Sequence, residues 1–254
     1  MNKRQFLKGM ILFFPAARLA ETLIQIGDRA AASEAGTGAA YDPASHYYGM
    51  GIEIDKCIGC NHCVEACKAE NNVPQEPYYF RTWVERYTIL KGGETEVECI
   101  STGQKREGST DHDDRDVIRS FFVPKLCNHC AHPPCVQVCP VGATFATQDG
   151  VVLVDSERCI GCRYCIQACP YGARFFNPKT RTADKCTFCY HRVTKGLLPA
   201  CVEVCPTQAR IFGDLKSRAS RLVRFERMNN TGVLKPALNT SPKVYYAQLD
   251  GEVR

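Results

Sequence analysis

The spacing of the cysteines constrains this chain more than any other feature. Seventeen of its 254 residues are cysteine, and sixteen of them fall into four groups of four. The groups are Cys57, Cys60, Cys63 and Cys67; Cys127, Cys130, Cys135 and Cys139; Cys159, Cys162, Cys165 and Cys169; and Cys186, Cys189, Cys201 and Cys205. The first and third groups share the spacing CxxCxxCxxxC, whereas the second and fourth widen the middle gap. Any fold of this sequence must therefore accommodate four sets of neighbouring thiols.

Runs of this kind are typical ligand sets of cubane iron–sulfur clusters. In the bacterial ferredoxin pattern, three closely spaced thiolates bind one cluster and the fourth reaches a different cluster. Zinc ribbons instead use two CxxC pairs separated by a long spacer, and disulfides among repeated CxxC thiols would be strained. We therefore predict four 4Fe-4S clusters held by all sixteen cysteines. Cys99 belongs to no group and is predicted to be a plain buried or half-exposed residue.

Glycine and proline recur at fixed positions in these groups. Gly59 and Gly161 precede the second cysteine of their groups, where the missing side chain lets backbone amides approach the sulfurs. A proline follows the last cysteine of the second, third and fourth groups, whereas Lys68 follows that of the first. The three residues before each last cysteine suit one helical turn, which this proline ends.

Two longer units also recur along the chain. Residues 54–60 recur, slightly lengthened, as residues 154–162. The second unit begins at the last cysteine of a group and occupies residues 139–145, 169–175 and 205–212. Such duplication predicts stacked copies of one cluster-binding unit.

The remaining segments predict an α+β fold class with two tandem bacterial-ferredoxin-like dicluster modules, which are short hairpins and short helices around Fe-S clusters. Residues 151–155 follow an Asp-Gly turn and predict a hairpin strand, with residues 51–55 as its counterpart. A cysteine-poor, β-rich insertion contains predicted strands at 83–90 and 119–123 around a polar loop at 101–116. The tail is sparse in apolar residues, so we expect it to wrap the core or a partner after a basic helix at 215–228.

These predictions give the following domain boundaries. They are 1–32 for a signal segment of the twin-arginine (Tat) type, 48–72 plus 180–213 for the first dicluster module, 73–123 for the insertion, 124–179 for the second dicluster module, and 214–254 for the C-terminal helix and partner-docking tail.

The formal charge of +5 counts every cysteine as neutral. Thiolates bound to clusters would make the loaded protein more acidic, so the basic excess is interpreted as internal compensation and not as a nucleic-acid surface. Basic residues that flank the sites could raise cluster potentials or simply be solvated, and the sequence favours neither; they are Lys56, Lys125, Arg158, Lys185 and Arg192. The nearby histidines are predicted to pack or to form hydrogen bonds; they are His62, His129, His132 and His191.

The N-terminus has the features of a targeting segment. Lys3 and Arg4 precede an apolar run from Met10 to Ala17, and small residues follow at 30–32. This resembles a twin-arginine export signal with lysine in place of the first arginine, and Arg18 shortens the apolar run. Such export suits a protein that folds around its metal before crossing the membrane. An amphipathic helix on a cytoplasmic protein is the alternative. No stretch approaches the roughly 20 apolar residues of a membrane-spanning helix, so we expect membrane attachment only through a partner.

Over residues 48–246 the chain resembles the four-cluster iron–sulfur subunits of molybdopterin oxidoreductase complexes, of the polysulfide, tetrathionate and formate-dependent nitrite reductase types. The motifs that carry the resemblance are Cys127-Asn128-His129-Cys130 with Pro133-Pro134-Cys135, Asp184-Lys185-Cys186-Thr187-Phe188-Cys189, and Leu198-Pro199-Ala200-Cys201-Val202-Glu203. The resemblance implies a molybdopterin-type catalytic subunit and an NrfD-like integral membrane subunit that handles quinol as partners. A multihaem cytochrome c is an alternative partner. It also implies anaerobic respiration on the periplasmic side of the bacterial inner membrane, with the cytoplasmic face as the alternative.

The resemblance further implies that the groups exchange their last cysteines. We number the resulting quartets after the group that provides three thiols. The implied sets are quartet 1, Cys57, Cys60, Cys63 and Cys205; quartet 2, Cys127, Cys130, Cys135 and Cys169; quartet 3, Cys159, Cys162, Cys165 and Cys139; and quartet 4, Cys186, Cys189, Cys201 and Cys67.

No nucleophile, general base or substrate-pocket signature stands out, so we expect no bond-making catalysis by this chain alone. A wire subunit of a respiratory complex is the favoured function. The alternatives are a free-standing polyferredoxin, which would leave the insertion and tail without a purpose, and a zinc-stabilised binding module.

Overall fold

The computed structural model describes residues 41–102, 104–105 and 116–253. Contacts divide the chain into two compact units, residues 1–41 and residues 42–254. The signal segment predicted at 1–32 lies outside the described residues. Among the residues that are described, no helix combines the length and apolarity needed to cross a membrane.

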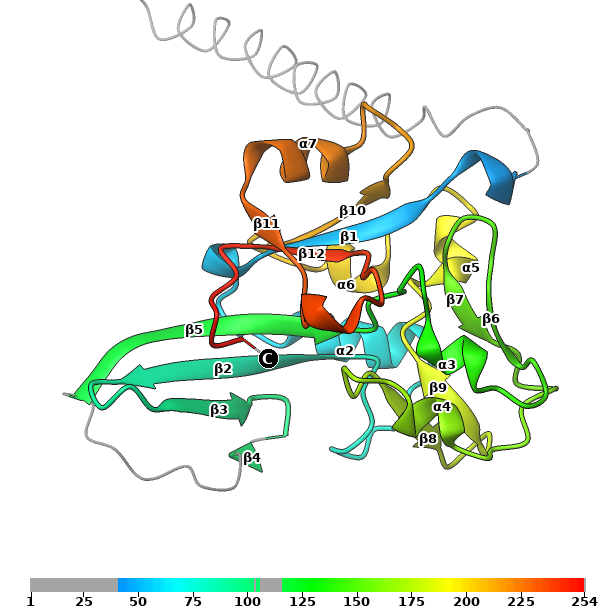
Figure 1. Cartoon of the computed structure of the whole chain (residues 1–254), viewed down its shortest axis with the longest axis horizontal. Coiled ribbons are helices and arrows are strands. Elements are labelled where there is room, and N and C mark those ends of the chain that lie inside the picture. The colour runs from blue at the N-terminus through cyan, green and yellow to red at the C-terminus, as the bar shows by residue number, and fades with distance from the viewer. Residues whose placement is uncertain (1–40, 103, 106–115, 254) are drawn as a thin grey trace, which may run out of the picture. The chain divides into compact units, whose positions relative to one another are not determined.

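A four-stranded sheet brings the beginning and the end of the second unit together. Its strands, in spatial order, are β10 (Arg210–Asp214), β1 (Tyr48–Glu53), β12 (Val244–Ala247) and β11 (Thr231–Gly232). β1 runs antiparallel to β10 and parallel to β12, as the blue, orange and red strands of Figure 1 show. Met50, Ile52 and Tyr246 are fully buried. The C-terminal tail therefore wraps the core and adds a strand to it.

Helix α7 (Arg221–Met228) covers this sheet. The Ser220 side chain accepts a hydrogen bond from the backbone N–H of Leu222 and caps the helix, so the helix begins six residues later than the 215–228 predicted. Gly51 of β1 allows the close approach, because a Cβ atom there would lie 2.6 Å from the Phe225 ring.

The insertion forms a second four-stranded sheet. Its strands, in spatial order, are β4 (Gln104–Lys105), β3 (Thr95–Cys99), β2 (Thr82–Leu90) and β5 (Val117–Leu126). The strands predicted at 83–90 and 119–123 are confirmed and are longer than expected. The polar loop predicted at 101–116 begins with β4, and residues 106–115 lie outside the described residues. β5 ends directly before the second cysteine group, so the sheet anchors that group.

Two short hairpins connect the cysteine groups. They are β6 (Thr144–Ala146) with β7 (Val152–Val154), and β8 (Arg174–Asn177) with β9 (Thr182–Lys185). The hairpin strand predicted at 151–155 is confirmed. Its predicted counterpart at 51–55 is only partly right, because β1 ends at Glu53 and the 3₁₀ helix η2 (Ile54–Lys56) follows. β1 pairs with β10 and β12, which are distant in the sequence.

Five helices lie next to the cysteines, and proline ends three of them after one turn. They are α2 (His62–Glu70), α3 (Pro134–Gln137), α4 (Tyr164–Gln167), α5 (Tyr190–Val193) and α6 (Ala200–Glu203), beside the 3₁₀ turns η1 (Pro43–Ser45) and η4 (Pro236–Leu238). α3, α4 and α6 have four residues each and stop before a Cys-Pro pair, because proline provides no backbone N–H. α2 has Lys68 at that position and continues for nine residues.

Candidate metal centres

All seventeen cysteines lie in the described part of the chain, and none forms a disulfide there. Cys99 is half-buried in β3, as predicted for a residue outside the groups.

Quartet 1 surrounds a small cavity. Cys57, Cys60 and Cys63 line it together with Cys205, although Cys205 lies far along the chain. η2 and the start of α2 position the first three thiols, and the turn after α6 delivers the fourth. The antiparallel pairing of β1 with β10 brings these segments together.

Quartet 2 has the same construction. A second small cavity is lined by Cys127, Cys130 and Cys135 together with Cys169. β5 leads into the first of these cysteines, and α4 ends just before Cys169. The exchange of last cysteines that the family resemblance implies is thus present around both cavities.

Quartet 4 is the most deeply buried set. The Asn71 Nδ2 atom lies 3.6 Å from the Cys67 sulfur and 3.5 Å from the Cys189 sulfur, so it joins the two groups. Burial raises the pKa of the Cys67 thiol well above its usual value, and the other three thiols of quartet 4 raise it further. Because metal ligation requires the thiolate form, a metal bound here would displace these protons into the solvent.

Quartet 3 lies beside quartet 2. Cys165 packs in one core cluster with Cys135, and Cys159 packs against that cluster. Cys139 sits before β6, where the Thr144 backbone N–H donates to its sulfur at 3.5 Å. The inclusion of Cys139 in quartet 3 rests on the family resemblance.

All four CxxC loops share one backbone turn. The residue before the second cysteine has positive φ in every group: Gly59 at 71°, His129 at 41°, Gly161 at 69° and Phe188 at 53°. At this turn of the fourth group the Phe188 backbone N–H donates to the Cys186 sulfur at 3.4 Å. Close packing is a second reason for glycine at the other two positions. A Cβ atom at Gly59 would lie 2.7 Å from the Phe122 ring, and one at Gly161 would lie 2.8 Å from the Arg181 carbonyl oxygen.

Two buried arginines that the sequence interpretation missed contact cysteine sulfur. The Arg174 Nη2 atom donates to the Cys135 sulfur at 3.1 Å, and the Arg210 Nη2 atom donates to the Cys63 sulfur at 3.3 Å. The position of these arginines in the repeats could have revealed them, because each stands five residues after the last cysteine of its group.

The same arginines test whether these sites fit a cluster. The Arg174 Nε and Arg210 Nη1 atoms are buried without a hydrogen-bond partner among the described atoms. Burial of a charge is costly unless it is paired. N–H groups aimed at sulfur suit an anionic iron–sulfur cluster, whose sulfurs accept hydrogen bonds, so the residues present fit this cofactor.

The basic residues predicted near the sites take different roles. Lys56, Arg158 and Arg192 form ion pairs with carboxylates at or near the surface. Lys125 is buried against Glu85, 2.7 Å away, whereas Lys185 is buried among backbone carbonyls.

The predicted histidines pack or form hydrogen bonds in three of four cases. His129 is fully buried, stacks on Phe188 with ring centroids 3.7 Å apart and accepts a hydrogen bond from the Val152 backbone N–H. His191 lies 2.7 Å from Glu70, and His132 lies 3.3 Å from the Ser241 hydroxyl. His62 is exposed at the start of α2.

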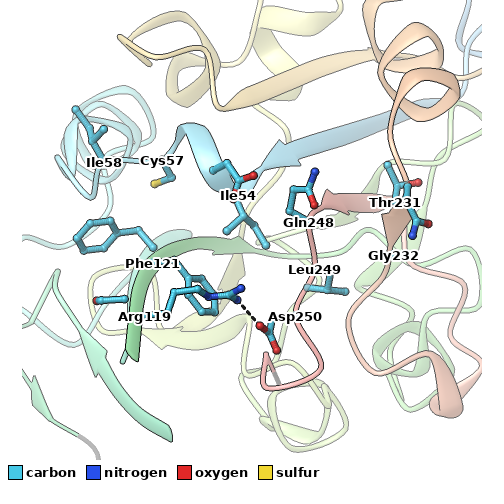
Figure 2. Close-up of a pocket in the computed structure, with 14 residues that line it drawn as sticks. Ile54, Cys57, Ile58, Arg119, Phe121, Thr231, Gly232, Gln248, Leu249 and Asp250 are labelled. Carbon is cyan, nitrogen blue, oxygen red and sulfur yellow. Dashed lines mark hydrogen bonds and ion pairs between the residues drawn. The ribbon is translucent and has the colours of Figure 1, made fainter. Parts of the chain in front are cut away.

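A hollow beside quartet 1 is open to solvent. Figure 2 shows Cys57 and Ile58 on one side of it and the C-terminal residues Gln248 and Leu249 on the other. An ion pair between Arg119 of β5 and Asp250 crosses the hollow. The tail and the insertion thus meet next to a predicted cluster ligand.

Comparisons with known proteins agree with this site. Two family models, each described as a 4Fe-4S dicluster domain, match residues 56–143 and residues 118–215. Two dicluster domains correspond to four 4Fe-4S clusters, so the chain carries four such clusters.

Three relatives cover most of the chain. The B component of tetrathionate reductase from Salmonella typhimurium is 48% identical over 207 residues, which span 81% of this chain and 74% of that protein. Protein NrfC of Escherichia coli is 41% identical, with 78% of this chain and 79% of that protein covered. The B component of polysulfide reductase from Wolinella succinogenes is 37% identical, with coverage of 78% and 92%. The chain therefore belongs to the family of 4Fe-4S dicluster proteins that act as iron–sulfur electron-transfer subunits of reductase complexes.

Proposed function

We propose that this chain carries electrons between an NrfD-like integral membrane subunit and a molybdopterin-type or cytochrome-bearing catalytic subunit of a respiratory oxidoreductase complex. The names of its relatives, which include components of a tetrathionate reductase and of a polysulfide reductase, support such a role. The absence of a transmembrane helix among the described residues leaves membrane attachment to the partner in this proposal.

The observation that carries the proposal is the pair of cavities in which three cysteines of one group meet a fourth from another. We assign the sixteen cluster ligands as the quartets defined above. Bound there, 4Fe-4S clusters accept and donate single electrons.

Contacts between groups support one order of the quartets. Arg210 reaches Cys63 of quartet 1 and Cys201 of quartet 4. Lys185 faces Cys186 of quartet 4 and Cys127 of quartet 2. Since Cys135 of quartet 2 and Cys165 of quartet 3 share a core cluster, the quartets follow one another as 1, 4, 2 and 3.

The solvent exposure of the cysteines also supports quartets 1 and 3 as the two ends of this series. Cys60 and Cys162 are the exposed cysteines among the seventeen, and they belong to quartets 1 and 3. Each follows an exposed isoleucine, Ile58 at 59% and Ile160 at 65%. We infer that these two Cys-Ile-Gly-Cys loops face the electron donor and the electron acceptor.

We further propose an α+β architecture in which residues 73–123 are an insertion and residues 214–254 a tail, both docked on partner subunits. The hollow in Figure 2 supports this, since the insertion and tail both line it beside Cys57. Attachment at the periplasmic side of the inner membrane remains part of the proposal, together with the signal segment at 1–32.

Affinity purification of the tagged full chain from solubilised membranes tests the proposal. We expect it to retain a larger molybdenum-containing or cytochrome-bearing subunit and a membrane protein with several spans. Recovery as a lone soluble protein would favour the free-standing polyferredoxin instead.

Two surface variants sharpen this experiment. Ile58→Asp and Ile160→Asp are each expected to weaken retention of a different partner. Leu197→Asp is the matched control, because Leu197 is 52% exposed and belongs to neither loop, nor to the insertion or the tail. If all three variants retain both partners equally, the two Cys-Ile-Gly-Cys loops do not face the electron donor and the electron acceptor.

A further inference from the structure

Three cations are buried in the core where two thiolate quartets meet, and a further buried lysine, Lys243, lies beside quartet 2. The exposed fractions are 3% for Arg210, 1% for Lys185 and 5% for Arg174. In the described part of the chain, no carboxylate forms an ion pair with any of them. A buried charge is strongly destabilising unless an opposite charge offsets it. The thiolates are the anionic groups around these three side chains.

Arg210 stands between quartets 1 and 4. Its Nη2 atom donates to the Cys63 sulfur at 3.3 Å and to the Thr82 hydroxyl oxygen at 2.7 Å. The guanidinium charge also acts on the Cys201 thiol of quartet 4 and favours its thiolate form. The planar fork of an arginine can donate to two groups at once, so one side chain serves both quartets.

Arg174 holds the same position between quartets 2 and 3. Its Nη2 atom donates to the Cys135 sulfur at 3.1 Å and its Nη1 atom donates to the Thr144 hydroxyl oxygen at 3.2 Å. The guanidinium charge also faces the Cys165 thiol of quartet 3. A threonine anchor and two cysteines from different quartets therefore recur around both arginines.

Lys185 lies between quartets 4 and 2. Its ammonium donates to the Cys186 carbonyl oxygen at 2.6 Å and to the Val152 carbonyl oxygen. Val152 lines the cavity of quartet 2. The charge of Lys185 also acts on the thiolates of Cys127 and Cys186, one from each quartet.

We propose that Arg210, Lys185 and Arg174 are positioning residues for electron transfer, each of which raises the reduction potentials of the two clusters beside it. This inference rests on the proposed function, because it requires the quartets to hold clusters. Reduction adds negative charge to a site, and a fixed cation stabilises the reduced form. Hydrogen bonds to cluster sulfur act in the same direction.

A cation shared by two clusters also changes the electrostatic interaction between those clusters. Two anionic clusters in a low-dielectric interior repel each other, so an electron on one makes reduction of the next harder. A cation between them offsets that repulsion. The three junctions of a series of four quartets each contain one such charge.

Redox titration of three variants, monitored by electron paramagnetic resonance, tests the proposal through a pattern of shifts. Arg210→Gln should lower two of the four midpoint potentials, and Arg174→Gln should lower the other two. Lys185→Met should lower one from each pair. We expect each affected reduction equilibrium to change at least tenfold, which is about 59 mV for a one-electron couple.

Matched variants separate charge from general disturbance. Arg86→Gln also removes a guanidinium, but Arg86 pairs with Glu98 at the surface of the insertion sheet, so no midpoint should move. Arg210→Lys retains the charge and should shift the same two midpoints less than Arg210→Gln does. Equal shifts in the lysine and glutamine variants would overturn the role of charge.

A second pair of variants tests the inference even if the Arg210→Gln and Arg174→Gln variants fail to bind iron. Thr82→Asp and Thr144→Asp leave the arginines in place and set a carboxylate against each one. They should lower the same pairs of midpoints as the corresponding glutamine variants. Full iron content with all four midpoints unmoved would overturn this inference, whereas a wild-type chain that binds little iron would overturn the proposed function itself.

Discussion

At the scale of single residues, the backbone turn of the CxxC loops explains which positions tolerate a side chain. Two groups use glycine there, while the other two place His129 and Phe188 at positive φ. Those two rings stack on each other, so packing offsets the cost of the unusual backbone. Gly59 has no such freedom, because Phe122 occupies the space in which a Cβ atom would lie.

Gly59→Ala is therefore expected to destabilise quartet 1. The left-handed backbone and the clash with Phe122 should together cost about 1 to 3 kcal/mol, seen as faster iron release to a chelator and a lower thermal midpoint. Gly92→Ala is the control, because a Cβ atom at Gly92 has open space around it. Equal iron release by the two variants would show that the turn does not determine cluster retention.

A single carboxylate links the first described residues to the sheet. The Asp214 carboxylate contacts the His46 ring nitrogen at 2.8 Å and accepts from the Tyr47 backbone N–H at 2.9 Å. Burial alone would raise the pKa of Asp214, but the hydrogen bonds from His46, Tyr47 and Lys216 outweigh it and lower that pKa.

A lowered carboxylate pKa means that its stabilising effect is present above the unfolded value of about 3.9 and is lost as pH falls through the folded value. Asp214→Asn should thus be less stable than wild type near neutral pH. The gap between their thermal midpoints should narrow as the solution is acidified below about pH 4. A gap that stays constant down to about pH 3 would contradict this assignment.

At the scale of elements, the cysteine spacing and the turn signals predicted the local structure well. Val152 to Val154 follow an Asp-Gly turn and form a hairpin strand, and proline after the last cysteine ended three helices after one turn. The cavities around quartets 1 and 2 contain the cysteine sets that the family resemblance implied.

Elements that depend on distant pairing were not predictable from local patterns. Nothing near β1 indicates that its neighbours are β10 and β12, which lie far along the chain. The charges of Arg174 and Arg210 suggest exposure, yet both are buried, because thiolates in distant segments surround them. Lys68 stands where the other three groups have proline, and it allows α2 to run for nine residues.

Strand β12 gives a test at this scale. Tyr246 is fully buried, and its hydroxyl donates to the Pro124 carbonyl oxygen of β5, which links the two larger sheets. Tyr246→Ala should lower stability by about 3 kcal/mol or more, measured by anaerobic calorimetry. Tyr78→Ala, at a site that is 67% exposed, should change stability by less than about 0.5 kcal/mol. Similar effects would mean that the tail is not a core strand.

At the scale of the whole molecule, the interleaving of cysteine groups couples distant segments. Quartet 1 takes three thiols from residues 57–63 and one from Cys205, so one cluster would close a loop through most of the chain. Cross-links of this kind restrict the unfolded state and help a chain with small sheets to remain folded.

Cys205→Ser tests this coupling directly. The variant should lose at least one iron per chain, together with a change in the paramagnetic signal of a single cluster. Cys99→Ser, which alters a cysteine outside the quartets, should retain the wild-type iron content. A Cys205→Ser protein with full iron and an unchanged spectrum would place the fourth ligand of quartet 1 elsewhere.

The central claim is that four thiolate quartets hold four 4Fe-4S clusters. Its most direct test is the iron and acid-labile sulfide content of the anaerobically purified full chain, together with the electron paramagnetic resonance spectrum after reduction. The account predicts four irons and four sulfides for each of four clusters, and signals of reduced clusters that interact magnetically. Much less iron, without a paramagnetic signal on reduction, would contradict it.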